Sequence, residues 1–90
     1  MTDLETEALA IIQKAFDAAE TYEARIILNV FRAHWALTLR ADQIKTVGDC
    51  LNNVVMHEDS FKRELSKLVR NKVLRTRTIN KKRVYELKLS

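Results

Sequence analysis

The sequence predicts an α+β fold that is mostly helical, with a β-hairpin at its C-terminal end. Apolar residues recur at three- and four-residue steps through most of the chain, whereas strict alternation with polar residues occurs only near the C-terminus. One glycine and no proline leave few programmed breaks. Because 90 residues support one modest core, a single domain over residues 1–90 is expected.

Two helices are predicted in the first part of the chain. Residues 3–19 form an amphipathic helix that Thr2 or Asp3 can cap. Residues 22–37 form a second helix with Thr21 as its N-cap, and apolar residues lie on more than one of its sides. This second helix is therefore expected to form the centre of the core.

The middle of the chain predicts a short strand and a third helix. Residues 38–40 suit a small strand. The helix begins at residue 41 and either ends at Gly48, which suits a C-cap, or runs through it into the following apolar residues. The sequence leaves the path of residues 49–59 open.

Residues 58–71 carry the clearest helical pattern. Four apolar residues form one face: Phe61, Leu65, Leu68 and Val69. Asp59 or Ser60 is expected to cap the helix. Glu64, the one acidic residue between positions 60 and 71, is expected to lie toward the side, so that the outward face is basic.

Two alternating segments follow. Residues 73–79 and 83–89 alternate between polar and apolar side chains on either side of a polar turn at 80–82, in which Asn80 can adopt a left-handed conformation. Leu74, Thr76 and Thr78 share one face of the first segment, and Tyr85, Leu87 and Leu89 share one face of the second. This alternation predicts an antiparallel hairpin with one buried face.

The passage SFKRELSKLVRNKVLR at residues 60–75 resembles the recognition helix and first wing strand of winged helix-turn-helix domains. RVYEL at 83–87 is similar to the returning wing strand, and residues 39–47 resemble the short strand and first helix of the motif. The resemblance covers residues 38–89. It implies a winged helix-turn-helix domain that places helix 58–71 in the major groove of double-stranded DNA. Residues 49–59 are longer than the family's usual tight turn, and the wing turn is short.

The charge distribution favours an anionic partner for the second half of the chain. Residues 1–50 carry five Lys or Arg and eight Asp or Glu, a net charge of −3, whereas residues 51–90 carry eleven and four, a net charge of +7. Ten residues are the expected DNA-binding set: Ser60, Lys62, Arg63, Lys67, Arg70, Arg75, Arg77, Lys81, Lys82 and Arg83. The basic side chains could instead only solvate this half.

Two hypotheses about function remain in competition. In the first, the protein is a small transcriptional regulator that binds double-stranded DNA, as a homodimer formed through residues 1–37; these helices could instead pack only on their own core. In the second, it is a protein–protein interaction module, such as a phage- or virus-type adaptor or inhibitor that uses the winged helix as a scaffold. The long segment at 49–59 and the short wing favour this second hypothesis.

Other classes of function find no support in the sequence. No constellation of catalytic residues, cofactor motif or small-molecule site is evident, so neither an enzyme nor a cofactor is expected. His34, His57 and Cys50 do not have metal-ligand spacing. No apolar run is long enough to span a bilayer. With one cysteine no internal disulfide is possible, which favours the cytoplasm, or the nucleus in a eukaryote.

Overall fold

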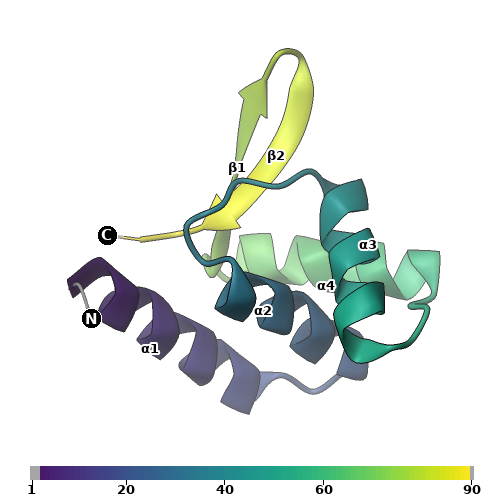
Figure 1. Ribbon diagram of the computed structural model, residues 1–90, viewed down its shortest axis with the longest axis horizontal. Helices are drawn as coiled ribbons and strands as arrows, with labels where there is room; N and C mark the ends of the chain where they lie inside the picture. The colour runs from purple at the N-terminus through teal and green to yellow at the C-terminus, as the bar shows by residue number, and fades with distance from the viewer. Residues whose placement is uncertain (1–2, 90) are drawn as a thin grey trace.

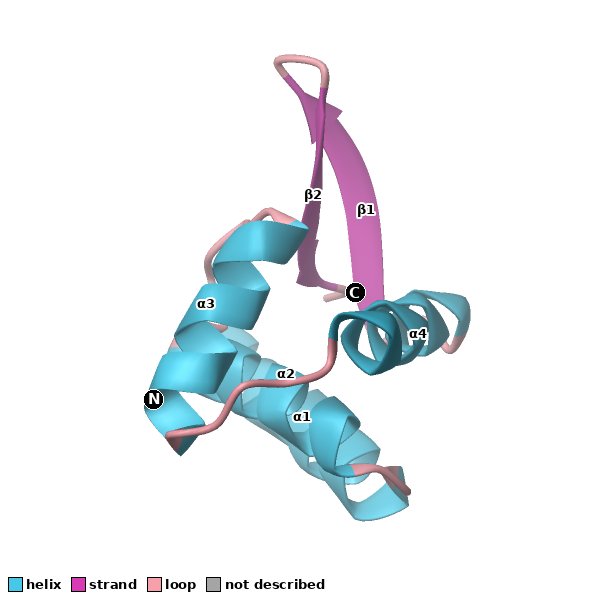
Figure 2. Ribbon diagram, turned by 90° about the vertical axis from the view of Figure 1, so that its right-hand side faces the viewer, coloured by secondary structure: helices cyan, strands magenta, loops and turns pink. Residues whose placement is uncertain are grey.

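In a computed structural model, which describes residues 3–89, the chain folds into four α-helices followed by a two-stranded antiparallel hairpin (Figure 1). The elements are, in chain order, α1 (Asp3–Ala18), α2 (Tyr22–Ala33), α3 (Ala41–Asn52), α4 (Glu58–Arg70), β1 (Leu74–Ile79) and β2 (Lys82–Leu87). The helices gather into one cluster, from which the hairpin projects (Figure 2). The domain therefore has the α+β, mostly helical composition that the sequence predicts.

Helix α2 lies at the centre of the core. Five of its apolar side chains are almost completely buried: Ile26, Ile27, Leu28, Val30 and Phe31. The Thr21 hydroxyl accepts a hydrogen bond from the backbone N–H of Ala24 at 3.2 Å, which confirms the predicted N-cap. The helix ends at Ala33 and not at residue 37, because the backbone of His34 leaves helical geometry (φ −135°, ψ 51°). Leu37 is therefore outside the helix and 48% exposed.

Helix α1 packs on the core through Ala8 and Ile12, which are fully buried. Ile11 and Phe16 lie half-buried at the edges of this contact. The helix ends at Ala18, close to the predicted end. Asp3 is already a helical residue and not its N-cap, and the capping role predicted for Thr2 lies outside the described residues.

Helix α3 runs through Gly48 and ends at Asn52, so a C-cap at Gly48 is wrong and the alternative of a continuous helix is correct. The left-handed C-cap residue is Asn53, with φ 52°. Gly48 serves a different purpose, since a Cβ atom there would lie 2.9 Å from Cγ2 of Ile26. The glycine therefore allows α3 to approach α2 closely.

Helix α4 buries the face that its apolar spacing predicts. Phe61, Leu65 and Leu68 are buried, and Val69 lies half-buried beside them. The predicted N-caps are wrong, because Asp59 and Ser60 lie within the first turn and His57 occupies the capping position. The acidic first turn still suits the helix dipole.

The hairpin pairs β1 with β2 in the register Leu74–Leu87 to Ile79–Lys82. Its turn consists of Asn80 and Lys81, both with positive φ, which matches the right-handed twist of the strands. The segment between α2 and α3 joins the hairpin through Leu39, whose backbone exchanges two hydrogen bonds with Tyr85 (2.9 and 2.7 Å). This bridge agrees with the short strand predicted at residues 38–40.

The hairpin is buried mainly near its base, where Tyr85 and Leu89 also pack against the core. Leu74 and Leu87 at the base are buried, but Thr76 and Thr78 are exposed, and Val84 on the opposite face is buried instead. The cause is geometric: the hairpin extends beyond the helices, so that only the part of its strands nearest the helices is covered (Figure 1).

Candidate nucleic-acid interface

The outward face of α4 presents the basic side chains that the sequence assigns to it. Because Phe61, Leu65 and Leu68 anchor the opposite face in the core, the helix has one fixed rotation about its axis. Four basic side chains on α4 are exposed: Lys62, Arg63, Lys67 and Arg70. Ser60 is half-buried, and its Oγ atom lies 3.5 Å from Nη2 of Arg63.

Glu64 is a buried carboxylate beneath this face, and the expectation that it lies at the side of the helix is wrong. Its side chain is only 5% exposed. Its Oε1 atom lies 3.6 Å from Nζ of Lys67 and 3.7 Å from Nε of Arg63. Lys62 lies 3.7 Å from the Glu58 carboxylate. Three of the four α4 cations therefore have an acidic neighbour that offsets part of their charge.

The two arginines of β1 share one carboxylate. Nε of Arg75 and Nε of Arg77 lie 2.5 and 3.3 Å from Oε1 of Glu86, and the Thr38 hydroxyl donates to Oε2 at 2.9 Å. Burial would raise the pKa of Glu86, but these hydrogen bonds and the two positive charges outweigh it, so the pKa lies below its usual value. Glu86 is therefore charged at neutral pH and holds both guanidinium groups along the strand.

The hairpin tip carries three cations without an acidic neighbour in the described part of the chain. Lys81, Lys82 and Arg83 are exposed, and no ion pair within residues 3–89 involves them. The tip stands well away from α4 (Figure 1). The ten predicted residues thus form three groups, on α4, along β1 and at the hairpin tip.

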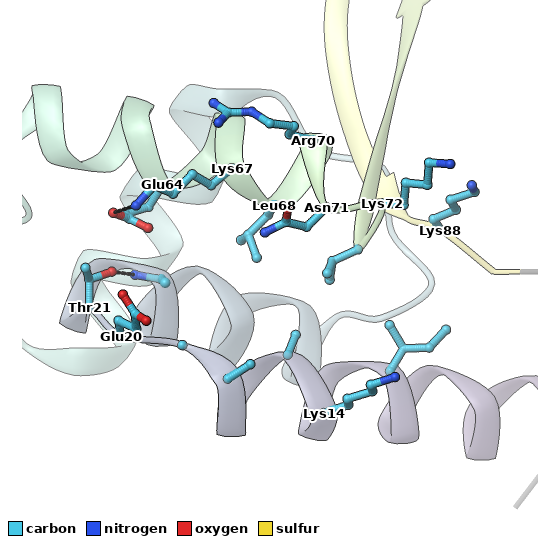
Figure 3. A pocket seen from close by; sticks show the side chains of 16 residues that line it. Lys14, Glu20, Thr21, Glu64, Lys67, Leu68, Arg70, Asn71, Lys72 and Lys88 are labelled. Atoms are coloured by element: carbon cyan, nitrogen blue, oxygen red, sulfur yellow. Dashed lines mark hydrogen bonds and ion pairs between the residues drawn. The ribbon is translucent and has the colours of Figure 1, made fainter.

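A groove between α1 and α4 is a feature that the sequence reasoning missed. It has a volume of about 640 Å³ and is lined by α1, the α1–α2 connection, α4, the turn after α4 and Lys88 (Figure 3). Lys67 and Arg70 belong to the predicted set and also line this groove. Lys14, Lys72 and Lys88 line it as well and were not singled out, because they lie on three segments that only the tertiary structure brings together.

The remaining candidate chemistry is sparse in the described part of the chain. No group of three or more His, Cys, Asp or Glu residues within residues 3–89 could hold a metal ion. Cys50 is exposed at the end of α3, and the two histidines are exposed as well. None of the helices within these residues is both long and apolar enough to cross a membrane.

The fold and the site define a small α+β domain whose exposed cations lie on a helix, on the hairpin that follows it and around a groove. Comparison with known proteins does not extend this description. A scan against protein-family models, a search of curated proteins and a search of solved structures each found no match to the chain.

Proposed function

We propose that the protein is a winged helix-turn-helix domain that binds double-stranded DNA and acts as a small transcriptional regulator. In this proposal α3 and α4 form the helix-turn-helix, Leu39 supplies the short strand and the β1–β2 hairpin is the wing. The observation that carries the proposal is the continuity of a basic helix with a hairpin that has a basic tip. Only residues 71–73 separate α4 from β1, so the cations of the helix and those of the hairpin lie on one continuous segment of the chain.

Helix α4 would lie in the major groove, with Arg63 and Lys67 facing base edges or phosphates. Lys81, Lys82 and Arg83 would contact the phosphate backbone at a distance from the helix. Arg75 and Arg77 contribute less, because Glu86 neutralises one of their two charges. Phosphate contacts of this kind release counterions, so affinity should fall steeply as the salt concentration rises.

The test is fluorescence anisotropy with a labelled random-sequence duplex at low and moderate salt. The charge-reversal variant Arg63→Glu/Lys67→Glu should lose binding. The control Lys14→Glu/Lys88→Glu makes the same change in net charge at two residues that do not belong to the predicted DNA-binding set, and it should retain most of the binding. Equal losses in both variants, or no binding by the native protein at low salt, would reject the proposal.

A second double variant guards against unfolding, since Lys67 lies beside the buried Glu64. Lys81→Gln/Lys82→Gln changes two exposed side chains for which residues 3–89 provide no ion-pair partner. It should leave the melting temperature unchanged. Each lost phosphate contact should lower the slope of log affinity against log salt by about 1. An unchanged slope would exclude the hairpin tip from the DNA interface.

The alternative function is a protein–protein interaction module, and one observation favours it. Val55 is 86% exposed and lines a shallow hollow together with Cys50 and Val54, and Leu51, which follows Cys50 in the sequence, is 55% exposed. Exposed apolar side chains that lie together are typical of protein-binding surfaces. A stoichiometric protein partner that co-purifies without nucleic acid, and dissociates when Val55 is changed to Asp, would support this function over DNA binding.

A further inference from the structure

The groove between α1 and α4 has the size of a ligand site. Its volume of about 640 Å³ lies within the roughly 300–1,000 Å³ that is typical of small-molecule pockets. Its walls include apolar side chains from both helices, among them Ile11, Ala15 and Leu68. The groove therefore combines an apolar middle with charged residues, which is the usual composition of such sites.

One end of the groove is basic. Lys14, Lys72 and Lys88 come from α1, the turn after α4 and the segment after β2, and they lie toward the same end in Figure 3. All three are exposed, and no ion pair within residues 3–89 involves any of them. An anion placed in this part of the groove would be attracted by the three unpaired ammonium groups around it. We call this the basic end.

The opposite end carries two carboxylates, with Lys67 beside one of them. Glu64 and Glu20 lie there, next to Thr21 (Figure 3). Glu64 is 4% exposed, and its Oε1 atom is buried without a hydrogen bond. Lys67 and Arg63 provide positive charge at 3.6 and 3.7 Å, but these distances are too long for hydrogen bonds. A deeply buried carboxylate with an oxygen that lacks a donor is unfavourable, and an N–H group of a ligand that binds the Glu64 carboxylate from the groove would lessen this cost. We call this the acidic end.

We propose that this groove binds a small organic molecule that carries an anionic group at one end and a positively charged or neutral N–H donor at the other. The anionic group, a carboxylate or a phosphate, lies at the basic end between Lys72 and Lys88. The N–H donor binds the Glu64 carboxylate at the acidic end, and the linking atoms lie against Leu68. The proposal does not depend on DNA binding.

The experiment is a titration followed by amide chemical shifts in NMR spectra, without nucleic acid. The probes are straight-chain ω-amino acids of increasing length: γ-aminobutyrate, δ-aminovalerate and ε-aminocaproate. At least one of them should cause saturable shifts at Glu64, Lys72 and Lys88. Hexanoate and hexylamine each retain one of the two charged groups. Both should bind at least tenfold more weakly than the amino acid that binds most tightly. Absence of saturable shifts with all three amino acids would overturn the proposal.

Matched variants separate this groove from general charge effects. Lys72→Gln/Lys88→Gln should weaken binding of the best probe at least tenfold. Lys81→Gln/Lys82→Gln makes the same change in net charge at the hairpin tip and should bind it as the native protein does. Glu64→Gln should abolish the preference for the amino acid over hexanoate. Equal losses in the two lysine variants, or a preference that Glu64→Gln leaves intact, would contradict the proposed ligand.

Discussion

The carboxylate of Asp49 accepts a hydrogen bond from the backbone N–H of Met56, with a distance of 3.0 Å between Oδ1 and the nitrogen. Its other oxygen receives one from Lys45 at 2.7 Å. Asp49 lies in the last turns of α3, and Met56 is a buried residue just before α4. This side chain therefore helps to fix the path of the segment that joins the two helices, which the sequence left open.

Replacement of Asp49 by Ala should destabilise the fold. The substitution leaves the Met56 N–H and the Lys45 ammonium without their partner, and the loss of an acceptor for a partly buried donor costs about 1–3 kcal/mol. Urea denaturation followed by circular dichroism measures the change. The control is Asp42→Ala, which removes an exposed partner of Arg40 on the same helix and should have a much smaller effect. Equal effects would show that Asp49 does not fix this segment.

Acid should destabilise the protein through Asp49 and Glu86. Burial would raise the pKa of Asp49, but the hydrogen bonds from Lys45 and Met56 outweigh it and hold the pKa below its usual 3.8; Glu86 likewise lies below 4.5. Because both pKa values are lower in the folded state, the stabilisation is complete above the unfolded values and is lost as pH falls through the folded ones. The melting temperature should therefore fall as the pH is lowered below about 4.5.

The variant Asp49→Asn/Glu86→Gln tests this assignment. It should be less stable than the native protein at neutral pH, yet its melting temperature should depend less on pH in the acid range. A variant with an unchanged acid dependence would show that other carboxylates cause the transition.

Gly48→Ala should destabilise the domain although alanine favours helices. The new Cβ atom would lie 2.9 Å from Ile26 Cγ2, and Ile26 is buried in the core. Overpacking costs about 1–3 kcal/mol, which exceeds the gain of about 1 kcal/mol in helix propensity. The expected net loss is about 1 kcal/mol in the free energy of unfolding. Thr46→Ala, at an exposed position on α3, should cause no loss. A more stable Gly48→Ala variant would refute the close approach of the helices.

Lys81→Gly should increase the stability of the fold and decrease its affinity for DNA. Lys81 has φ 64°, a conformation that glycine adopts without strain, and Asn-Gly is a preferred sequence for this hairpin turn. The variant should therefore be more stable by up to about 1 kcal/mol. It should also bind duplex DNA more weakly, since a cation of the tip is lost. A variant that is more stable and binds DNA equally well would remove Lys81 from the interface.

Periodicity predicted most of the fold, and its failures have identifiable physical causes. The helix at 58–71 was found because Phe61, Leu65 and Leu68 share one face. The same spacing marks Glu64, which lies three residues after Phe61 and four before Leu68, as a buried residue. Its charge argued against burial, and the spacing was the better indicator. The end of α2 was missed because no glycine or proline marks it.

Less of the candidate site than of the fold could be predicted from the sequence. A run of basic residues identifies the cations of α4 and the hairpin tip, but gives no sign that Glu86 binds Arg75 and Arg77 from the opposite strand. The groove depends on how α1 lies relative to α4. Lys14 and Lys88 are far apart in the sequence, and no local pattern indicates that they line one hollow.

The backbone bridge between Leu39 and Tyr85 has a consequence for the order of folding. It closes a chain segment that contains α3, α4 and β1, whereas the hairpin itself forms through local pairing. Long-range contacts form more slowly than local ones because closing a longer loop costs more entropy. We therefore expect the helices and the hairpin to form first and the bridge to form last. A truncation that removes β2 also removes Tyr85, so the segment between α2 and α3 could not form this bridge. Folding would then stop before its final step.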